Sequence, residues 1–136
     1  MVNDYNLTEQ ITFLGAKFED DLNYEMNSCR YILVPSSNEA FGNVAIEGMA
    51  SGCLPFVSNA GGLPEAVGDA GILFSSKSVD NLVEKIMEII ENPNLEHKYR
   101  QKMSKHLLNH EPQVVSKKYW DIILNCTGLK SKNRDS

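Results

Sequence analysis

The chain has 136 residues, of which 42% are hydrophobic and 23% are charged, and its net charge is −5. This length suffices for one domain with a hydrophobic core but not for two, and the composition is ordinary for a soluble globular protein. The acidic balance argues against a nucleic acid or an anionic membrane surface as the main partner.

The three cysteines, Cys29, Cys53 and Cys126, are odd in number and show no C-x-x-C spacing. We expect them to be buried or unreactive thiols in a reducing compartment, which predicts a cytoplasmic location. The chain opens with polar residues, and its apolar runs are short. Neither a signal peptide nor a membrane-spanning segment is therefore expected.

Short apolar runs alternate with helical patterns along the first part of the chain. After a polar lead over residues 1–10, Ile11–Leu14 is expected to form a strand that stops at Gly15. Three acidic residues predict a helix start at residues 18–21, where the helix dipole favours negative charge. The continuous apolar run Tyr31–Val34 predicts a strand that is covered on both faces.

The stretch Val34–Gly52, VPSSNEAFGNVAIEGMASG, is the one around which the chain is organised. It leaves an apolar strand, passes through a polar turn and enters a helix near Phe41. Glu39 in the turn and Glu47 in the helix both lie near a helix N-terminus, whose free amide groups attract anions. Such an arrangement can hold a ligand with a phosphate and several hydroxyls, because the carboxylates accept hydrogen bonds from the hydroxyls. A sugar nucleotide fits this description.

The remaining elements follow the same alternation. In chain order we expect a strand over Leu54–Val57, a loop over Ser58–Gly62, one helical turn over Leu63–Val67, a strand over Gly71–Phe74, a helix that Ser78 caps and that ends at Asn92-Pro93, and two further helices marked by Leu95 and Val115. Pro55 predicts that the first residues of its strand lie outside the ladder or at a sheet edge. Residues 127–136 are expected to form a disordered tail.

Strands that alternate with helices at this spacing predict an α/β fold, with a parallel sheet and helices on its faces. In such sheets, ligands bind at the carboxyl ends of the strands. The Val34–Gly52 stretch and the loop at Ser58–Gly62 both fall at that edge. Motif and position therefore predict the same binding site.

Simpler interpretations stay open for these features. Glu39 and Glu47 can be two solvated acids, and an acid–base pair for hydrolysis is disfavoured because neither lies in an evidently apolar pocket. Gly61-Gly62 can be a tight turn or a place where the backbone approaches a ligand. The sequence has no G-x-G-x-x-G and no G-x-x-x-x-G-K-[ST], so dinucleotide and P-loop sites lack their main signal.

Two histidines, His106 and His110, are spaced as i and i+4 and could face one metal ion. No third ligand or catalytic glutamate lies between them, so we expect a surface position and no metal site. Cys29 and Cys53 have no histidine nearby in the sequence, which leaves nucleophilic catalysis unsupported.

The run Glu39–Glu47, E-A-F-G-N-V-A-I-E, resembles the E-x7-E signature of retaining glycosyltransferases with the GT-B fold, of the family 4 (group 1) type. Further runs match in the right order over about residues 11–125. They are Ile11–Gly15 (xFxG), Tyr31–Ser36 (a strand ending in Pro-Ser), Glu47–Gly52 (E-x-M-A-x-G), Gly61–Glu65 (GGxxE) and Gly71–Phe74 (GxLx). Ala40 stands where the family usually has glycine, and Gly48 where it usually has alanine. The resemblance implies that residues 11–126 are part of the Rossmann-like, C-terminal donor-binding domain.

The family's roles carry over by position. Glu39 resembles the catalytic-site carboxylate that contacts the hydroxyls of the donor sugar, and Glu47 the carboxylate that holds the ribose. Ala40, Phe41, Gly42 and Asn43 resemble the family's donor-binding loop and helix start, whose backbone amides approach the sugar and the distal phosphate. Gly61 and Gly62 resemble a second donor-binding loop behind them. Gly15, Ala16 and Lys17 lie where the family contacts the base. The implied reaction transfers a hexose from a nucleotide sugar to an acceptor hydroxyl with retention, in glycan biosynthesis, without a cofactor or an obligatory metal.

The resemblance also implies missing parts. The acceptor-binding N-terminal half and the first two strands of the donor half would precede this chain. Those strands usually lie between Ile11–Leu14 and Tyr31–Val34, so we expect the Ile11 strand to pair directly with Tyr31–Val34, with another copy or with a partner chain.

We therefore expect the chain alone to transfer no sugar. The alternative is a non-catalytic sugar-nucleotide-binding module or a partner subunit of a split glycosyltransferase. The expected location is the cytoplasm, including the cytoplasmic face of a membrane where lipid-linked acceptors reside.

Overall fold

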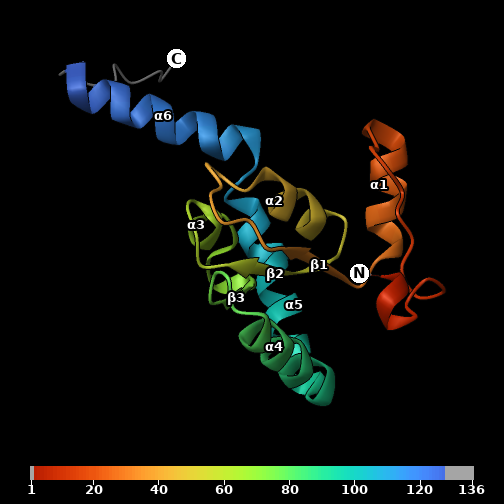
Figure 1. Cartoon of the computed structure of the whole chain (residues 1–136). Helices are drawn as coiled ribbons and strands as arrows, with labels where there is room; N and C mark the ends of the chain where they lie inside the picture. The colour runs from red at the N-terminus through yellow and green to blue at the C-terminus, as the bar shows by residue number, and fades with distance from the viewer. Residues whose placement is uncertain (1, 128–136) are drawn as a thin grey trace.

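Figure 1 shows a computed structural model of the chain, which describes residues 2–127. The elements are η1 (Asn3–Tyr5), α1 (Glu19–Ser28), β1 (Tyr31–Val34), α2 (Asn43–Ala50), β2 (Leu54–Ser58), α3 (Leu63–Val67), η2 (Gly68–Ala70), β3 (Ile72–Phe74), α4 (Val79–Glu91), α5 (Pro93–Leu108) and α6 (Pro112–Thr127). Every element expected from residue 18 onward is present. The tail predicted over 127–136 lies outside the described residues except for Thr127, which ends α6.

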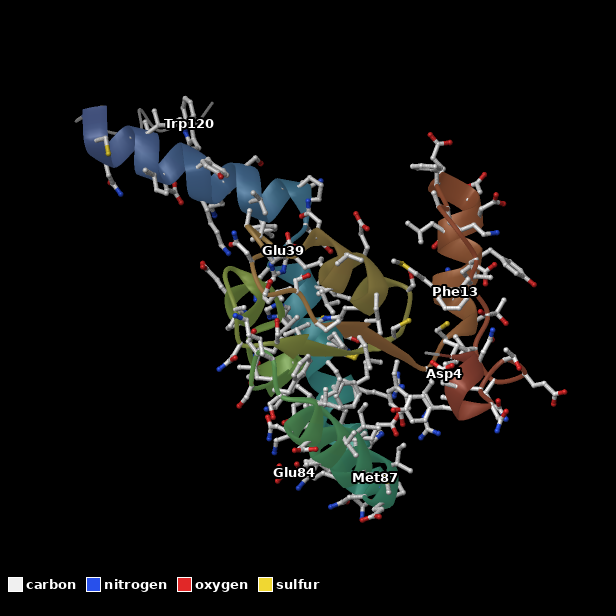
Figure 2. All side chains as sticks on the ribbon, in the orientation of Figure 1. Asp4, Phe13, Glu39, Glu84, Met87 and Trp120 are labelled. Atoms are coloured by element: carbon white, nitrogen blue, oxygen red, sulfur yellow. The ribbon has the colours of Figure 1, made fainter. Side chains whose placement is uncertain are left out.

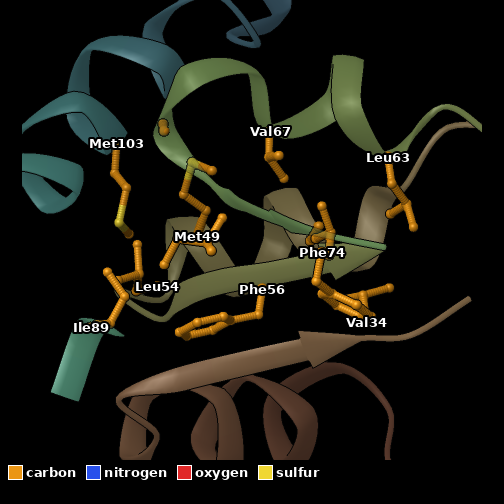
Figure 3. Close-up of a cluster of buried hydrophobic side chains, with 13 residues drawn as sticks. Val34, Met49, Leu54, Phe56, Leu63, Val67, Phe74, Ile89 and Met103 are labelled. Carbon is orange, nitrogen blue, oxygen red and sulfur yellow. The ribbon is translucent and has the colours of Figure 1, made fainter. Parts of the chain in front are cut away.

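The three strands form one parallel sheet in the order β1-β2-β3. Helix α2 packs on β1 through Gly48, where an added Cβ would come within 2.7 Å of the Cδ1 atom of Ile32. The core is one cluster of buried side chains from the sheet and helices α2 to α5 (Figure 3). It comprises Val34, Ala45, Met49, Leu54, Phe56, Val57, Leu63, Val67, Ala70, Ile72, Phe74, Ile89 and Met103. Within residues 2–127, no helix combines the length and hydropathy that a membrane span requires.

The strand predicted at Ile11–Leu14 is wrong. Residues 11–18 have no regular structure, and Phe13 is 81% exposed. A lone strand gains no ladder hydrogen bonds, and the described sheet has only three strands, none of which pairs with this segment. We call residues 2–28 the N-terminal arm; neither η1 nor α1 has a buried residue, and Figure 1 shows the arm to one side of the other elements.

Strand β1 was expected to be covered on both faces, and this is also wrong. It lies at the edge of the described sheet, and its Leu33 side chain is 46% exposed. On the other face Val34 is buried in the core. The apolar run Tyr31–Val34 is therefore buried on one face of the sheet and partly exposed on the other.

Of the two positions predicted from Pro55, the sheet edge is wrong, because β2 is the central and fully buried strand. Leu54 and Pro55 do lie outside the ladder with β3, although they pair with β1. The N–H of Leu54 donates to the carbonyl of Arg30 before β1 at 3.0 Å. Alternation along a parallel strand then turns the nitrogen of Pro55 towards β3. That strand pairs only from Phe56 onward, so the proline's missing donor leaves no gap in the ladder.

Helix α5 is tied to the amino ends of β1 and β2 by a buried carboxylate, Glu96. It accepts hydrogen bonds from the guanidinium groups of Arg30 (2.6 and 3.1 Å) and Arg100 (2.7 Å) and from the Tyr31 hydroxyl (3.0 Å). Arg100 also donates to the carbonyls of Gly52 and Arg30 at 2.8 and 2.9 Å. The hydrogen bonds from Arg30 above all, and those from Arg100 and Tyr31, lower the pKa of Glu96 to about 2 despite its burial.

Candidate functional site

The acidic turn after β1 closes on the start of α2. Gly42 is the N-cap residue with φ 90° and ψ 35°, a conformation that glycine adopts readily. Its N–H donates to the Oε1 atom of Glu39 at 3.4 Å, so this carboxylate lies at the helix start. Among the described residues, the N–H groups of Asn43 and Val44 have no acceptor. The turn therefore combines a carboxylate with free amides at a positive helix end.

Glu47 lies on the solvent-facing side of α2. The helix buries Ala45, Gly48 and Met49, whereas Asn43 and Glu47 are exposed. Residues four apart lie on the same face of a helix, so Glu47 is one turn beyond the free amide of Asn43. The second carboxylate and the amide end thus share one open surface.

The glycine loop after β2 packs directly against the acidic turn. The N–H of Gly62 donates to the carbonyl of Glu39 at 2.8 Å. A Cβ atom on Gly61 would overlap that carbonyl, and one on Gly62 would overlap the carbonyl of Ala40. The structure thus brings the two predicted segments together, and both glycines are needed for the close backbone approach.

A serine that the sequence analysis did not single out ties the same two segments together. Ser58, the last residue of β2, is buried, and its hydroxyl donates to the carbonyl of Ser36 in the acidic turn. A polar residue at the carboxyl end of a buried strand is the signal that could have revealed it. The bond fixes the turn relative to the strand tips.

His106 is not the solvated surface residue that we expected. It is partly buried, and its Nε2 atom lies 2.7 Å from the carbonyl oxygen of Ala66 in α3. The core position Met103, three residues earlier on α5, was the missed signal, because positions three apart share a helix face. Within residues 2–127, no three His, Cys, Asp or Glu side chains are grouped to hold a metal ion.

The predicted base-contact segment, Gly15–Lys17, is not joined to this surface. It lies beside α1, and the ammonium of Lys17 is 3.7 Å from the carboxylate of Glu25. The Glu39 turn and α1 lie at opposite ends of α2 (Figure 1), and Figure 2 shows Glu39 well apart from Phe13 of the arm. The structure therefore gathers the acidic turn, α2 and the glycine loop but not the third segment.

The surface around the two acids is open rather than enclosed. Phe41, between them, is 52% exposed. A cavity of about 360 Å³ instead lies at the amino end of β3, where Gly71, Tyr99 and Lys102 contribute to its walls. Because the acids follow the carboxyl end of β1, this cavity does not belong to the candidate site.

The cysteines divide by exposure. Cys53 is buried, as expected, and its thiol donates to the carbonyls of Met26 (3.1 Å) and Cys29 (3.4 Å). Burial raises the pKa of this thiol. Cys29 and Cys126 are exposed, and all three are free thiols.

The family of the chain follows from comparison with known proteins. A family model described as "Glycosyl transferases group 1" matches residues 1–106. The chain belongs to this family. The group 1 assignment agrees with the E-x7-E run and the glycine loop, whose backbones meet in the structure.

Two curated glycosyltransferases illustrate the relationship. An uncharacterised glycosyltransferase of Methanocaldococcus jannaschii is 39% identical over 92 residues, which cover 66% of this chain and 26% of that protein. The O-antigen chain mannosyltransferase B of Escherichia coli is 34% identical over 82 residues, covering 60% and 22% of the two chains. The chain thus spans about a quarter of the length of these relatives.

Solved structures give the same fold. Sucrose-phosphate synthase from Thermosynechococcus elongatus superposes with a TM-score of 0.68 at 25% identity, over 92% of this chain and 33% of that one. The Anabaena protein HepE in complex with UDP superposes with a TM-score of 0.66 at 24% identity, over 85% and 34%. The predicted fold class is confirmed: a partial Rossmann-like parallel sheet with flanking helices, part of the C-terminal domain of a GT-B glycosyltransferase.

Proposed function

We propose that this chain is the nucleotide-sugar-binding part of a retaining glycosyltransferase that transfers a hexose to an acceptor hydroxyl. One observation carries the proposal: the Glu39 turn and the Gly61-Gly62 loop are hydrogen-bonded and packed backbone to backbone at the carboxyl ends of β1 and β2. Beside them lie the free amides at the start of α2 and the exposed Glu47. Parallel sheets of this kind bind ligands at that edge.

Each group has a role in this proposal. Glu39 accepts hydrogen bonds from hydroxyls of the donor hexose, and Glu47 accepts them from the ribose. The amides of Asn43 and Val44, at the positive end of α2, face the distal phosphate. The backbone of Ala40 and Phe41 lies beside the sugar. These protein groups hold the donor without a cofactor or an obligatory metal ion.

Base contacts belong to the Gly15–Lys17 segment in this proposal. The side chain of Lys17 is engaged with Glu25, so the backbone would make these contacts. Gly15 has no side chain to shield its backbone, and its φ of 69° is one that glycine adopts readily. The arm would have to lie closer to the start of α2 than it does in this structure.

A missing acceptor-binding half, or a partner chain that supplies it, completes the enzyme in this proposal. The outer edge of β1 has no neighbouring strand among residues 2–127, and the N-terminal arm buries none of its side chains. Its exposed large apolar residues are Tyr5, Leu7, Ile11, Phe13, Leu14, Phe18 and Tyr24. Apolar surface of this extent is typically covered by another polypeptide segment. Self-association through the β1 edge is the other way to cover it.

The same openness favours a second candidate, a partner subunit of a split glycosyltransferase or a non-catalytic sugar-nucleotide-binding module. We place either form in the cytoplasm or at the cytoplasmic face of a membrane, in glycan biosynthesis. Adding the separately expressed missing half distinguishes the candidates. It restores transfer if this chain is the donor-binding part, and leaves only binding if the chain is a non-catalytic module.

Calorimetric titration of the whole chain with UDP-, GDP- and ADP-hexoses tests the proposal. We expect binding of one nucleotide class, and Glu47→Ala should weaken it by about 1–3 kcal/mol because a hydrogen bond to a charged group is lost. Glu91→Ala, which removes an exposed carboxylate at the end of α4, is the matched control and should leave the affinity unchanged. No binding of any of the three, or equal effects of both substitutions, would contradict the proposed site. The chain alone should transfer no sugar, and any turnover would refute that part.

A further inference from the structure

We infer that His106 of α5 is a positioning residue that holds the donor-binding turn in place through α3. The inference rests on the proposed function, because it concerns the same turn. His106 contacts neither Glu39 nor Glu47 directly. Its imidazole contacts the carbonyl of Ala66 in α3, and α3 in turn contacts the acidic turn.

The contact between His106 and α3 is a specific hydrogen bond. The carbonyl of Ala66 can only accept, so the Nε2 atom of His106, 2.7 Å away, carries the proton that it donates. Ala66 lies next to the last residue of α3, where helical carbonyls have no partner inside the helix. The imidazole therefore satisfies a carbonyl that the helix itself cannot.

From Ala66 the contacts lead directly to the acidic turn. Its N–H donates to the carbonyl of Gly62 at 2.9 Å, and the N–H of Gly62 donates to the carbonyl of Glu39 at 2.8 Å. An added Cβ on Gly42, the N-cap residue of α2, would lie 3.2 Å from the Cβ of Ala66 and 2.9 Å from Leu63. Helix α3 is thus the support on which both donor-binding segments rest.

A helix of this length needs such external support. Helix α3 has five residues and no side-chain N-cap hydrogen bond. Nucleating one turn costs more than its few hydrogen bonds return, so its geometry depends on packing and on outside partners. Leu63, Ala66 and Val67 supply the packing, and His106 supplies the polar partner from α5.

The imidazole is itself held from both sides. Gly68, which follows α3, has φ 52°, and a Cβ there would lie only 2.8 Å from the Cε1 atom of His106. The His110 ring packs at 4.7 Å between centroids, and its Nδ1 atom lies 3.2 Å from the carbonyl of His106. The other end of α5 is fixed by Glu96, so the histidine extends from a rigid element towards a short one.

Native-state hydrogen exchange of the whole chain tests this role without any ligand. The Gly62 N–H should exchange about tenfold faster in His106→Leu, the effect of losing about one hydrogen bond. The Val57 N–H in the central strand β2 reports global stability in the same sample. We expect the ratio of the two protection factors to fall in His106→Leu and to recover in His106→Gln, whose amide can again donate to Ala66.

His97→Leu is the matched control, because His97 lies exposed on the same helix and, within residues 2–127, its side chain hydrogen-bonds only to Gln101. It should leave the ratio unchanged. Equal losses of protection at Gly62 and Val57 in His106→Leu would assign His106 a general stabilising role and overturn the inference. So would an unchanged Gly62 amide, or a glutamine variant no better than leucine.

Titration of the same variants with UDP, GDP and ADP separates the effect of His106 on the turn from its effect on binding. If the wild-type chain binds one of these nucleotides, His106→Leu should raise its Kd about tenfold and His106→Gln should recover most of the affinity. If the wild-type chain binds none of the three, the proposed function fails, while the exchange ratio still decides whether His106 positions the turn. Unchanged affinity for the bound nucleotide in a leucine variant that has lost Gly62 protection would overturn the functional part of the inference.

Discussion

The carbonyl of Glu39 lies against the backbone of Gly61 so closely that no side chain fits between them. Gly61 also has φ 56°, in the left-handed region that glycine tolerates and other residues rarely adopt. The contact joins the two segments in which the sequence predicts a binding site, and it depends on the absence of a single methyl group.

Gly61→Ala should therefore destabilise the chain by about 2–4 kcal/mol, the sum of left-handed strain and a backbone clash. Urea unfolding followed by circular dichroism measures this change. Gly52→Ala is the control, because Gly52 has φ 90° and no atom of the described part of the chain lies within 4 Å of an added Cβ. It should cost only the strain, about 1–2 kcal/mol. Equal costs for both substitutions would show that the turn is free to move away from Gly61.

A second prediction concerns acid and the carboxylate of Glu96. Hydrogen bonds from Arg30 above all hold its pKa at about 2, below its ordinary 4.5. The folded state thus favours the ionised form, and the stabilisation is fully present above pH 4.5 and is lost as the pH falls towards 2. The gap corresponds to about 3 kcal/mol. We expect Glu96→Gln to lower the unfolding free energy by about 2–3 kcal/mol at pH 7 and by much less near pH 2.5.

The same urea titrations at pH 7, 4 and 2.5 include Glu91→Gln as the control. Glu91 is exposed at the end of α4, so this variant should follow the wild-type curve at every pH. A difference between Glu96→Gln and wild type that stays constant from pH 7 to 2.5 would mean that Glu96 stabilises by packing rather than by charge.

Local patterns were enough to predict most of the elements. Ser78, for example, caps α4 as predicted, with its hydroxyl accepting a hydrogen bond from the N–H of Asn81. Three strand predictions failed because a strand's environment depends on its neighbours. Ile11–Leu14 has an apolar sequence but no pairing partner, and β1 has a neighbouring strand on one side only, which leaves Leu33 exposed. Pro55 lies in the central strand instead of at an edge, and it fits there because pairing with β3 starts only at Phe56. Sequence periodicity carries no information about which neighbours are present.

The candidate site divides in the same way. The acidic turn and the glycine loop were predictable because each has a local signature and both follow strands of one parallel sheet. The hydrogen bond from Ser58 to Ser36 and the one from His106 to Ala66 were not, because each joins residues 22 or 40 positions apart. Contacts of this range are set by packing, and a single sequence does not reveal them.

The outer edge of β1 is expected to be an association surface. The carbonyl of Arg30 bonds to β2, so alternation turns the backbone groups of Tyr31 and Leu33 outward. Leu33 is also 46% exposed. Leu33→Lys should reduce concentration-dependent association in sedimentation velocity while changing the unfolding free energy by no more than about 0.5 kcal/mol.

Val83→Lys is the control for added charge, because Val83 is 51% exposed on α4, away from the edge. It should associate like the wild-type chain. A wild-type chain that stays monomeric at every concentration, or equal effects of both lysines, would contradict the assignment of the edge.

The final prediction uses Cys53 as a reporter of the N-terminal arm. Its thiol donates to the carbonyls of Met26 and Cys29 at the end of α1, so α1 must move before a reagent reaches the sulfur. Burial also raises its pKa, which lowers the fraction of reactive thiolate. With Ellman's reagent, the exposed Cys29 and Cys126 should react at once, and Cys53 much more slowly.

The double variant Cys29→Ala/Cys126→Ala isolates the slow thiol. Because the arm buries no side chain of η1 or α1, it should detach without global unfolding, and the labelling rate of Cys53 should then be nearly independent of urea. A rate that rises with urea as steeply as global unfolding would show that the arm is an integral part of the core. Labelling of Cys53 as fast as that of Cys29 would contradict its burial. A labelling rate that is nearly independent of urea is expected if the arm normally packs against a separate polypeptide segment.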